Sequence, residues 1–451
     1  MKKTGAFERT LEELSPGSSV VNDGRAGEFN CLRMVLLGDD QGAIQLVCRK
    51  NDLVDIEQIN AHLGRQLQVV GRPESPRFGR STGVVELPTL ANFTHSETVV
   101  DPQVDQLSSV RLELGEQGRT LHLSGEDFQS LTEEARRIAF AVSVGPSLWS
   151  LNDSERDQKE FRRAITKFTG LRIQQRIKDI LEFPPLPETA QRIVHLRMDP
   201  NTVMDDLVDV VESDPALAAQ VFSWASSSPG APVGQVRSVH DAVSRVLGFE
   251  LVMNMALGLV LKPSQGHHPE GYMESWQQAI WQAQAAGLLC TLMPSGKRPL
   301  FGLAYLSGLL HNFGFLVLGH VFPPHLKLVC RSLEANPNID SSVIEQYLLG
   351  ITREQIGALL MENWGMPEEV ASALRYQKHS GYDGRHSVYA KLLWLGRQLL
   401  VERGLSPGAS EPVPAAVFES LGLDEAKVHA RFDELVAKKD TALAMAGMMA
   451  Q

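Results

Sequence analysis

The sequence predicts a multi-domain protein, in which an α+β domain with a mixed sheet precedes an all-helical domain. Its 451 residues exceed what a single hydrophobic core usually organises. From Val20 to Phe128, short apolar runs alternate with Gly, Asp and Asn turns, as is typical of strands. After residue 150 the apolar residues recur with a helical period instead. We place the α+β domain at 1–148, a helical connector at 149–168 and the helical domain at 169–451.

The composition indicates a cytoplasmic protein without a broad nucleic-acid surface. The 43 basic and 54 acidic side chains give a formal charge of −11, so we expect no DNA partner. The four cysteines lie far apart without a Cys-x-x-Cys pair, which fits reduced thiols. The N-terminal sequence MKKTGAFERTLEEL contains no apolar segment of the kind that a secretory signal requires.

The N-terminal part contains a series of short predicted strands. Residues 31–50, CLRMVLLGDDQGAIQLVCRK, predict two strands joined by a hairpin turn, and a helix is expected at 55–63. Further segments of mostly β character are expected at 66–71, 81–87, 97–101, 108–118 and 120–128. This order indicates an α+β domain with a mixed sheet.

A set of motifs in this part resembles a known family. The series runs from Gly83-Val-Val-Glu-Leu-Pro88 through Asp101 to Leu-x-x-x-Asp-Phe-x-x-Leu at 123–131. It is similar to the YbaK/prolyl-tRNA synthetase-associated domain, whose members hydrolyse mischarged aminoacyl-tRNA. The resemblance implies a site with a lysine on an early strand and a Gly-Pro-type loop. Here Arg33 stands on the strand, with Gly83 and Pro88 in the loop, and an arginine cannot readily lose a proton.

The longest stretch without a formal charge, residues 300–322, contains Gly308-Leu-Leu-His-Asn-Phe-Gly314 at its centre. A run of about 20 apolar residues could span a bilayer. The internal His and Asn and the Pro-Pro that follows favour a core helix, so we expect no membrane association. The central motif resembles that of HD-type metal-dependent phosphohydrolases, with Asn312 in the place of an Asp. A neutral amide binds a divalent ion less strongly than a carboxylate, because it supplies one uncharged oxygen where a carboxylate supplies a negative charge and up to two oxygens.

Residues 181–260 contain a Pro-Pro-Leu-Pro opening, a helix start at Asp214-Pro-Ala-Leu217 and a later Leu247-Gly248. This series closely resembles the HDOD domain, and it is a more extensive likeness than the first. The likeness continues to about residue 400. We expect Asp214 and Ser238 to cap helices and Gly248 to allow close helix contact.

HDOD domains look like HD hydrolases with a varied metal site, so each ligand position implied by the resemblance is compared with this sequence. His311 is a plausible ligand. Gln278 stands where a first His is expected, Arg353 replaces another His, Gln377 and Lys378 replace a His-His pair, and Gly396 replaces an Asp. One ligand cannot hold an ion, so we expect no metal and no cofactor. His311 would then be a core histidine. Arg353 and Lys378 are either candidates for binding an anion or surface residues.

The sequence therefore favours a non-catalytic bacterial signal-transduction protein whose HDOD-like module binds a protein or a small anionic partner. One alternative is an aminoacyl-tRNA deacylase on the N-terminal module, with tRNA as its partner. A second alternative is a metal-dependent HD phosphohydrolase.

Overall fold

The computed structural model describes residues 19–22, 31–70, 97–113, 119–144, 154–169, 188–199, 201–215, 217–219, 221, 225, 238–249, 252–253, 256, 272–321, 323–406 and 412–437. The chain forms two compact units. Unit 1 consists of residues 1–150, 324–349 and 407–409, and unit 2 of residues 151–323, 350–406 and 410–451. Residues 324–349, which the sequence places inside the helical domain, therefore belong to the unit that contains the sheet.

Unit 1 is built on a mixed sheet, as predicted. The main sheet has the order β1-β8-β7-β2-β3-β6-β9, with β5 also paired to β2. β2 runs antiparallel to β3 and parallel to β7, while β3 and β6 are parallel. The strands are β1 (Ser19–Asn22), β2 (Cys31–Asp39), β3 (Gly42–Arg49), β5 (Gln68–Val69), β6 (Glu97–Val100), β7 (Ser109–Glu113), β8 (Arg119–Ser124) and β9 (Arg136–Arg137).

The hairpin predicted at 31–50 is confirmed. β2 and β3 pair from Leu32 with Arg49 to Asp39 with Gly42, which leaves a two-residue turn. Gly42 has a φ of 124°, a conformation that L side chains rarely adopt. A second, two-stranded sheet joins β4 (Asp52–Val54) to β10 (Ala141–Ser143) in antiparallel register.

Apolar side chains fill both faces of the main sheet, because neighbouring residues of a strand point to opposite sides. Val47 and Val100 belong to a cluster that includes Phe128. Their neighbours Leu46 and Val99 belong to the other cluster. The sequence assigned β character to all of 120–128, and this was wrong beyond residue 124, because Ser124 caps a helix there. The helices of unit 1 are α2 (Ile56–Leu63), the 3₁₀ turn η3 (Val104–Gln106), α3 (Gly125–Leu131), α14 (Pro323–Ala335) and α15 (Ser341–Leu349).

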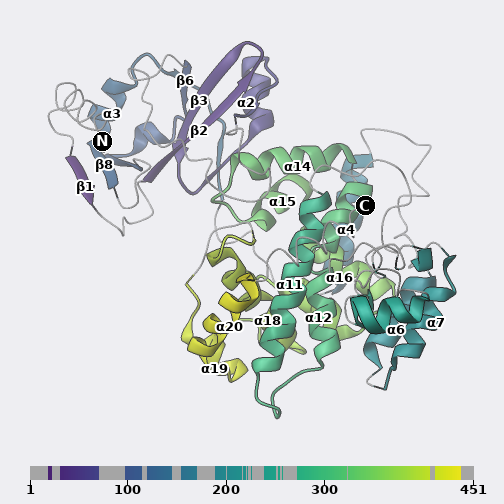
Figure 1. Ribbon diagram of the computed structural model, residues 1–451. Helices are drawn as coiled ribbons and strands as arrows, with labels where there is room; N and C mark the ends of the chain where they lie inside the picture. Colours follow the sequence, from purple (N-terminus) through teal and green to yellow (C-terminus); the bar gives the residue numbers. More distant parts are fainter. Residues whose placement is uncertain are drawn as a thin grey trace. The chain divides into compact units, whose positions relative to one another are not determined.

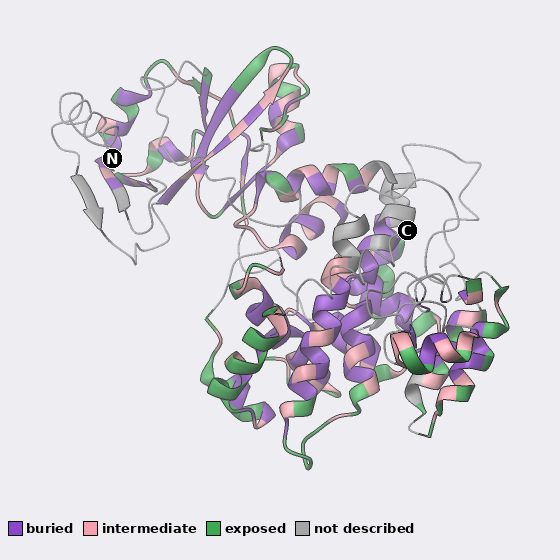
Figure 2. Ribbon diagram, in the orientation of Figure 1, coloured by how far each residue is buried: buried purple, intermediate pink, exposed green. Residues whose placement is uncertain are grey.

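The described part of unit 2 is helical throughout, as predicted (Figure 1). α11 packs against α12 and α18, and α17 packs against α12, α16 and α18. Buried residues are concentrated on α11, α12 and α18 (Figure 2). The helices are α4 (Ser154–Thr169), α6 (Glu188–Met198), α7 (Met204–Glu212), α9 (Val239–Asp241), the π-helical turn η5 (Ala242–Leu247), α11 (Tyr272–Leu292), α12 (Phe301–Leu310), α13 (Phe313–Val321), α16 (Arg353–Asn363), α17 (Glu368–Tyr376), α18 (Ser387–Glu402), α19 (Ala415–Leu421) and α20 (Glu425–Ala437).

The apolar stretch 300–322 forms two helices, α12 and α13, where the sequence suggested a single core helix. The break falls at His311 and Asn312. Among the described residues, no helix is both long enough and apolar enough to cross a membrane.

Two of the predicted helix caps are confirmed, and one glycine has a different role. The backbone N–H of Leu217 donates to Asp214 (3.1 Å) and that of Asp241 donates to Ser238 (3.0 Å). Gly248 was expected to allow close helix contact, but a Cβ there would meet nothing within 4 Å. Its φ of 83° explains the glycine instead, because other residues rarely adopt that conformation.

Candidate functional site

The centre of the candidate site is the break between α12 and α13. His311 ends α12, and its Nδ1 lies 2.8 Å from the carbonyl oxygen of Gly308. Because a carbonyl only accepts, Nδ1 carries the proton and Nε2 keeps the lone pair. Burial lowers the pKa of His311 to about 4, and the nearby charges of Arg397 and Arg353 add to the effect. The imidazole is therefore neutral at pH 7.

Two glycines of the central motif set the positions of these helices. A Cβ on Gly308 would lie 2.6 Å from the Cα of Ala283 on α11. A Cβ on Gly314 would lie 1.9 Å from the carbonyl oxygen of Arg353 on α16. Each of these two positions therefore requires a glycine, because any side chain would collide with the backbone of the neighbouring helix. The glycines of the motif therefore hold α12 against α11 and α13 against α16.

Arg353 faces the helix break from the start of α16. Its guanidinium donates to Oδ1 of Asn312 (3.2 Å) and lies 4.5 Å from the ring centroid of Phe315. Thr352 caps α16 by accepting from the backbone N–H of Gln355. This cap fixes the first turn of α16, and so the backbone from which Arg353 extends.

Gln377 and Lys378, at the end of α17, have different partners. Nε2 of Gln377 donates to the carbonyl oxygen of His311 (2.8 Å) and to that of Leu374 (3.0 Å), so this amide holds the helix break in place. Nζ of Lys378 lies 3.2 Å from Oε1 of Glu354. Both side chains of this ion pair are buried, with 9% and 5% of their surface exposed.

On α11, the residue that packs against Gly396 of α18 lies one helical turn after Gln278, the residue expected from the sequence. Gly396 packs against Gln282, whose Nε2 would lie 3.3 Å from a Cβ on that glycine. Gln282 is buried and donates to the carbonyl oxygen of Leu393 (2.7 Å). Gln278, the residue expected from sequence, lies one helical turn earlier and is only half-buried. The one sequence feature that pointed to Gln282 is its spacing of four positions from Gln278, which places the two glutamines on the same side of an apolar helix.

A buried charged cluster on α4 was not anticipated from sequence. Asp157 is 2% exposed, and its carboxylate accepts from Nε and Nη2 of Arg375 on α17. It also accepts from Nε2 of Gln355 on α16 (2.7 Å). Burial raises the pKa of the Asp157 carboxyl, while Arg375 and Gln355 act in the opposite direction. The predicted connector helix is thus tied to α17 by an ion pair and to α16 by a hydrogen bond.

The donor set does not fit the metal of HD-type hydrolases. The positions that resemble metal ligands hold one imidazole, three neutral amides, a guanidinium, an ammonium and a glycine. The described residues contain no group of three His, Cys, Asp or Glu side chains placed to hold a metal ion. The guanidinium of Arg353 would repel a divalent ion, which needs anionic oxygen or several imidazoles.

In unit 1, one of the three predicted deacylase-like positions can be placed. Arg33 lies on β2, and its guanidinium donates to the carbonyl oxygens of Asp52 (2.8 Å) and Ala335 (2.9 Å). It also donates to Oδ1 of Asn336. Gly83 and Pro88 lie outside the described residues.

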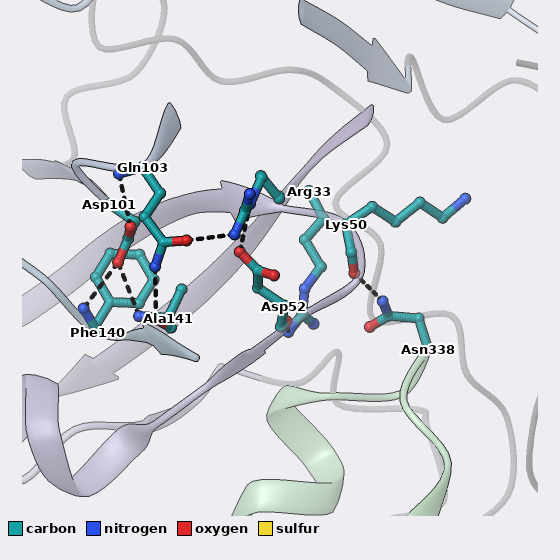
Figure 3. A network of polar contacts seen from close by, with 9 residues as sticks. Arg33, Lys50, Asp52, Asp101, Gln103, Phe140, Ala141 and Asn338 are labelled. Carbon is teal, nitrogen blue, oxygen red and sulfur yellow. Dashed lines mark hydrogen bonds and ion pairs between the residues drawn. The ribbon is translucent and has the colours of Figure 1, made fainter. Parts of the chain in front are cut away.

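Asp101, a further residue of the same motif series, binds backbone groups of its own unit (Figure 3). Its carboxylate accepts from the backbone N–H groups of Phe140 (3.0 Å), Ala141 (2.9 Å) and Gln103 (3.0 Å). It is 1% exposed, so these bonds replace those that water would make. The carboxylate joins the end of β6 to the start of β10.

Comparisons with known proteins support the C-terminal resemblance. A family model of the HDOD domain matches residues 183–380. A crystal structure from Marinobacter aquaeolei VT8, named for signal transduction, is 59% identical, covers 99% of each chain and has a TM-score of 0.88. A protein of Treponema pallidum (strain Nichols) is 26% identical over 220 residues, which are 48% of this chain. The match spans 41% of that relative's own length.

A more distant likeness concerns the N-terminal part. A trans-editing enzyme for prolyl-tRNA synthetase is 14% identical, covers 31% of this chain and 95% of its own, and has a TM-score of 0.26.

Proposed function

The chain belongs to the HDOD-domain family of signal transduction proteins, and from that membership we propose a non-catalytic regulatory protein whose helical unit binds a protein or a small anionic partner. The observation that carries the proposal is the replacement of metal ligands by paired polar groups. Asn312 binds Arg353, and Lys378 binds Glu354. A site with these side chains would not hold the ion that activates water in HD-type hydrolysis.

The position of Arg353 supports an anionic partner. Its guanidinium donates to the neutral amide oxygen of Asn312 and stacks on Phe315. A phosphate or carboxylate oxygen is a stronger acceptor for a guanidinium than an amide oxygen is. Lys378 is less suited to this role, because Glu354 already neutralises it. We therefore assign the anion contact to Arg353 first.

Calorimetric titration with inorganic pyrophosphate tests the small-anion form of the proposal. We expect binding to the wild type and at least tenfold weaker binding to Arg353→Gln. Arg385→Gln is the matched control, since the side chain of Arg385 is 79% exposed and pairs with the exposed carboxylate of Glu368. Equal affinity of the two variants would refute the role of Arg353. No binding by the wild type would leave only the protein partner.

Metal content and turnover test the non-catalytic part. Elemental analysis of the purified protein should find no stoichiometric transition metal, and phosphodiester hydrolysis with added Mn²⁺ should stay at the level of the buffer. Metal-dependent turnover that is lost in His311→Ala would restore the phosphohydrolase alternative. Hydrolysis of mischarged tRNA that depends on Gly83 would restore the deacylase alternative.

A further inference from the structure

Residues 324–349, here called the inserted helix pair, belong to unit 1 although α13 and α16 of unit 2 flank them in sequence. Ala335, at the end of α14, is 1% exposed and lies in the same apolar cluster as Val54, Ile56 and Phe140. The pair is therefore part of the core of the N-terminal unit.

Asn336 completes the edge of strand β4. Its Oδ1 accepts from the backbone N–H of Val54 (2.7 Å), and its Nδ2 donates to the carbonyl oxygen of Val54 (3.0 Å). The side-chain amide thus makes the two bonds that a neighbouring strand would make. The other edge of β4 is paired with β10.

The same amide oxygen also contacts Arg33. Oδ1 of Asn336 accepts from Nη2 of Arg33 as well as from the N–H of Val54. One oxygen atom therefore sits between a cationic guanidinium and a backbone N–H. Within the described part of the chain, three hydrogen bonds of Arg33 go to neutral oxygens, those of Asp52, Ala335 and Asn336, and its side chain also interacts with the thiol of Cys48. Guanidinium groups bind anionic oxygens more strongly than neutral ones.

Two further bonds hold the inserted helix pair, and neither involves this oxygen. Asn338 donates to the carbonyl oxygen of Lys50 (Figure 3). The hydroxyl of Tyr347 donates to the carboxylate of Asp55 (2.7 Å), the residue that caps α2. Loss of the Asn336 contact alone would therefore leave other attachments of the pair to unit 1.

We propose that Arg33 and the backbone N–H of Val54 form an oxyanion-binding site, which the amide oxygen of Asn336 occupies as an internal stand-in. A phosphate or carboxylate oxygen competes with Asn336 for this site. Its entry displaces the end of α14, so that ligand binding at the N-terminal unit loosens the inserted helix pair. The proposal does not depend on the anion contact assigned to Arg353.

The test is binding of inorganic phosphate to the full-length chain, followed by calorimetry and by the NMR shift of the Val54 amide. All variants also carry Arg353→Gln, so that the two anion contacts stay distinguishable. Asn336→Ala vacates the site, and we expect it to bind phosphate at least tenfold more tightly than the parent, with a shifted Val54 amide. Adding Arg33→Gln should abolish this binding. Asn363→Ala, which removes one exposed asparagine within α16, should behave as the parent.

Two results would overturn the proposal. One is equal phosphate affinity of the parent and the Asn336→Ala variant, and the other is tight binding that survives Arg33→Gln. If Asn336→Ala does not fold, hydrogen exchange of the parent provides the test. Phosphate, against chloride at the same ionic strength, should raise exchange in residues 330–345 and leave α18 unchanged. Unchanged exchange at 330–345 at saturating phosphate would equally refute the site.

Discussion

At the scale of single residues, the helical unit balances its buried charges locally. Lys378 and Glu354 form an ion pair with 9% and 5% of their side-chain surfaces exposed. Removing one member of a buried pair leaves the other charge uncompensated, which costs far more than losing a surface pair. The pair therefore constrains where α17 meets α16.

Replacement of Lys378 by Met should lower the free energy of unfolding by about 3 kcal/mol, because Glu354 loses its ammonium partner. Urea denaturation measures this. Lys391→Met is the control, since its partner Asp383 is 80% exposed and stays hydrated. The control should lose less than about 1 kcal/mol. Similar losses in the two variants would show that the Lys378 pair is not buried as described.

His311 should make stability depend on pH. Burial lowers its pKa to about 4 in the folded protein, below the unfolded value of 6.5. Between these values the unfolded chain binds the proton and the folded chain does not, so stability is complete above pH 6.5 and falls as the pH drops towards 4. At pH 5 the wild type should lose about 2 kcal/mol relative to His311→Gln. Parallel pH profiles of unfolding free energy in the two proteins would contradict this.

At the scale of elements, the central motif works through its glycines. Gly308 and Gly314 permit backbone contacts of α12 with α11 and of α13 with α16, and the helix break between them carries His311 and Asn312. The motif forms this helix arrangement with Asn312 in the place where HD-type motifs carry an Asp. The glycines that set the helix packing are therefore different residues of the motif from His311 and Asn312.

Gly314→Ala should destabilise the protein by roughly 3 kcal/mol, because its Cβ would meet the carbonyl oxygen of Arg353 and backbone cannot yield as a side chain can. Thermal or urea unfolding measures the loss. Gly296→Ala serves as the control, because a Cβ there meets nothing within 4 Å. A neutral Gly314→Ala would mean that α13 and α16 are further apart than described.

At the scale of the whole molecule, sequence order and structural unit disagree for residues 324–349. The chain leaves unit 2 after residue 323, contributes α14 and α15 to unit 1, and returns at residue 350. The flanking residues lead directly to the candidate site, since α13 begins beside Asn312 and α16 begins at Arg353.

The variant Phe140→Ala tests whether residues 324–349 belong to the core of unit 1. Phe140 is 0% exposed and shares a cluster with Ala335, so its truncation should lower the local stability of unit 1 by about 3–5 kcal/mol. Hydrogen exchange should rise in residues 324–349 together with β2 and β3, while α12 and α16 stay protected. Phe432→Ala, buried in α20 of unit 2, should leave 324–349 unchanged. If the hydrogen-exchange protection of residues 324–349 changed together with that of unit 2, the assignment of these residues to unit 1 would be wrong.

Much of the architecture follows from local sequence. The alternation of residues 31–50 predicts the hairpin, and Asp214 and Ser238 predict their helix starts, because strand pairing and capping depend on neighbours only a few positions apart. The positions of the altered metal ligands followed from the resemblance to HD-type motifs. Gln282 was missed because a shift of one helical turn leaves the apolar pattern of α11 unchanged.

The sequence by itself determined the class of each half and the presence of Asn312 where HD-type motifs carry an Asp, since composition, period and residue type are local properties. Only the tertiary structure decided which partners the remaining charges take: Glu354 for Lys378, Asp157 for Arg375, and the end of α14 for Arg33. These partners lie from 24 to about 300 positions apart along the chain, and no periodicity spans such distances. Long-range packing alone brings those atoms within hydrogen-bonding distance.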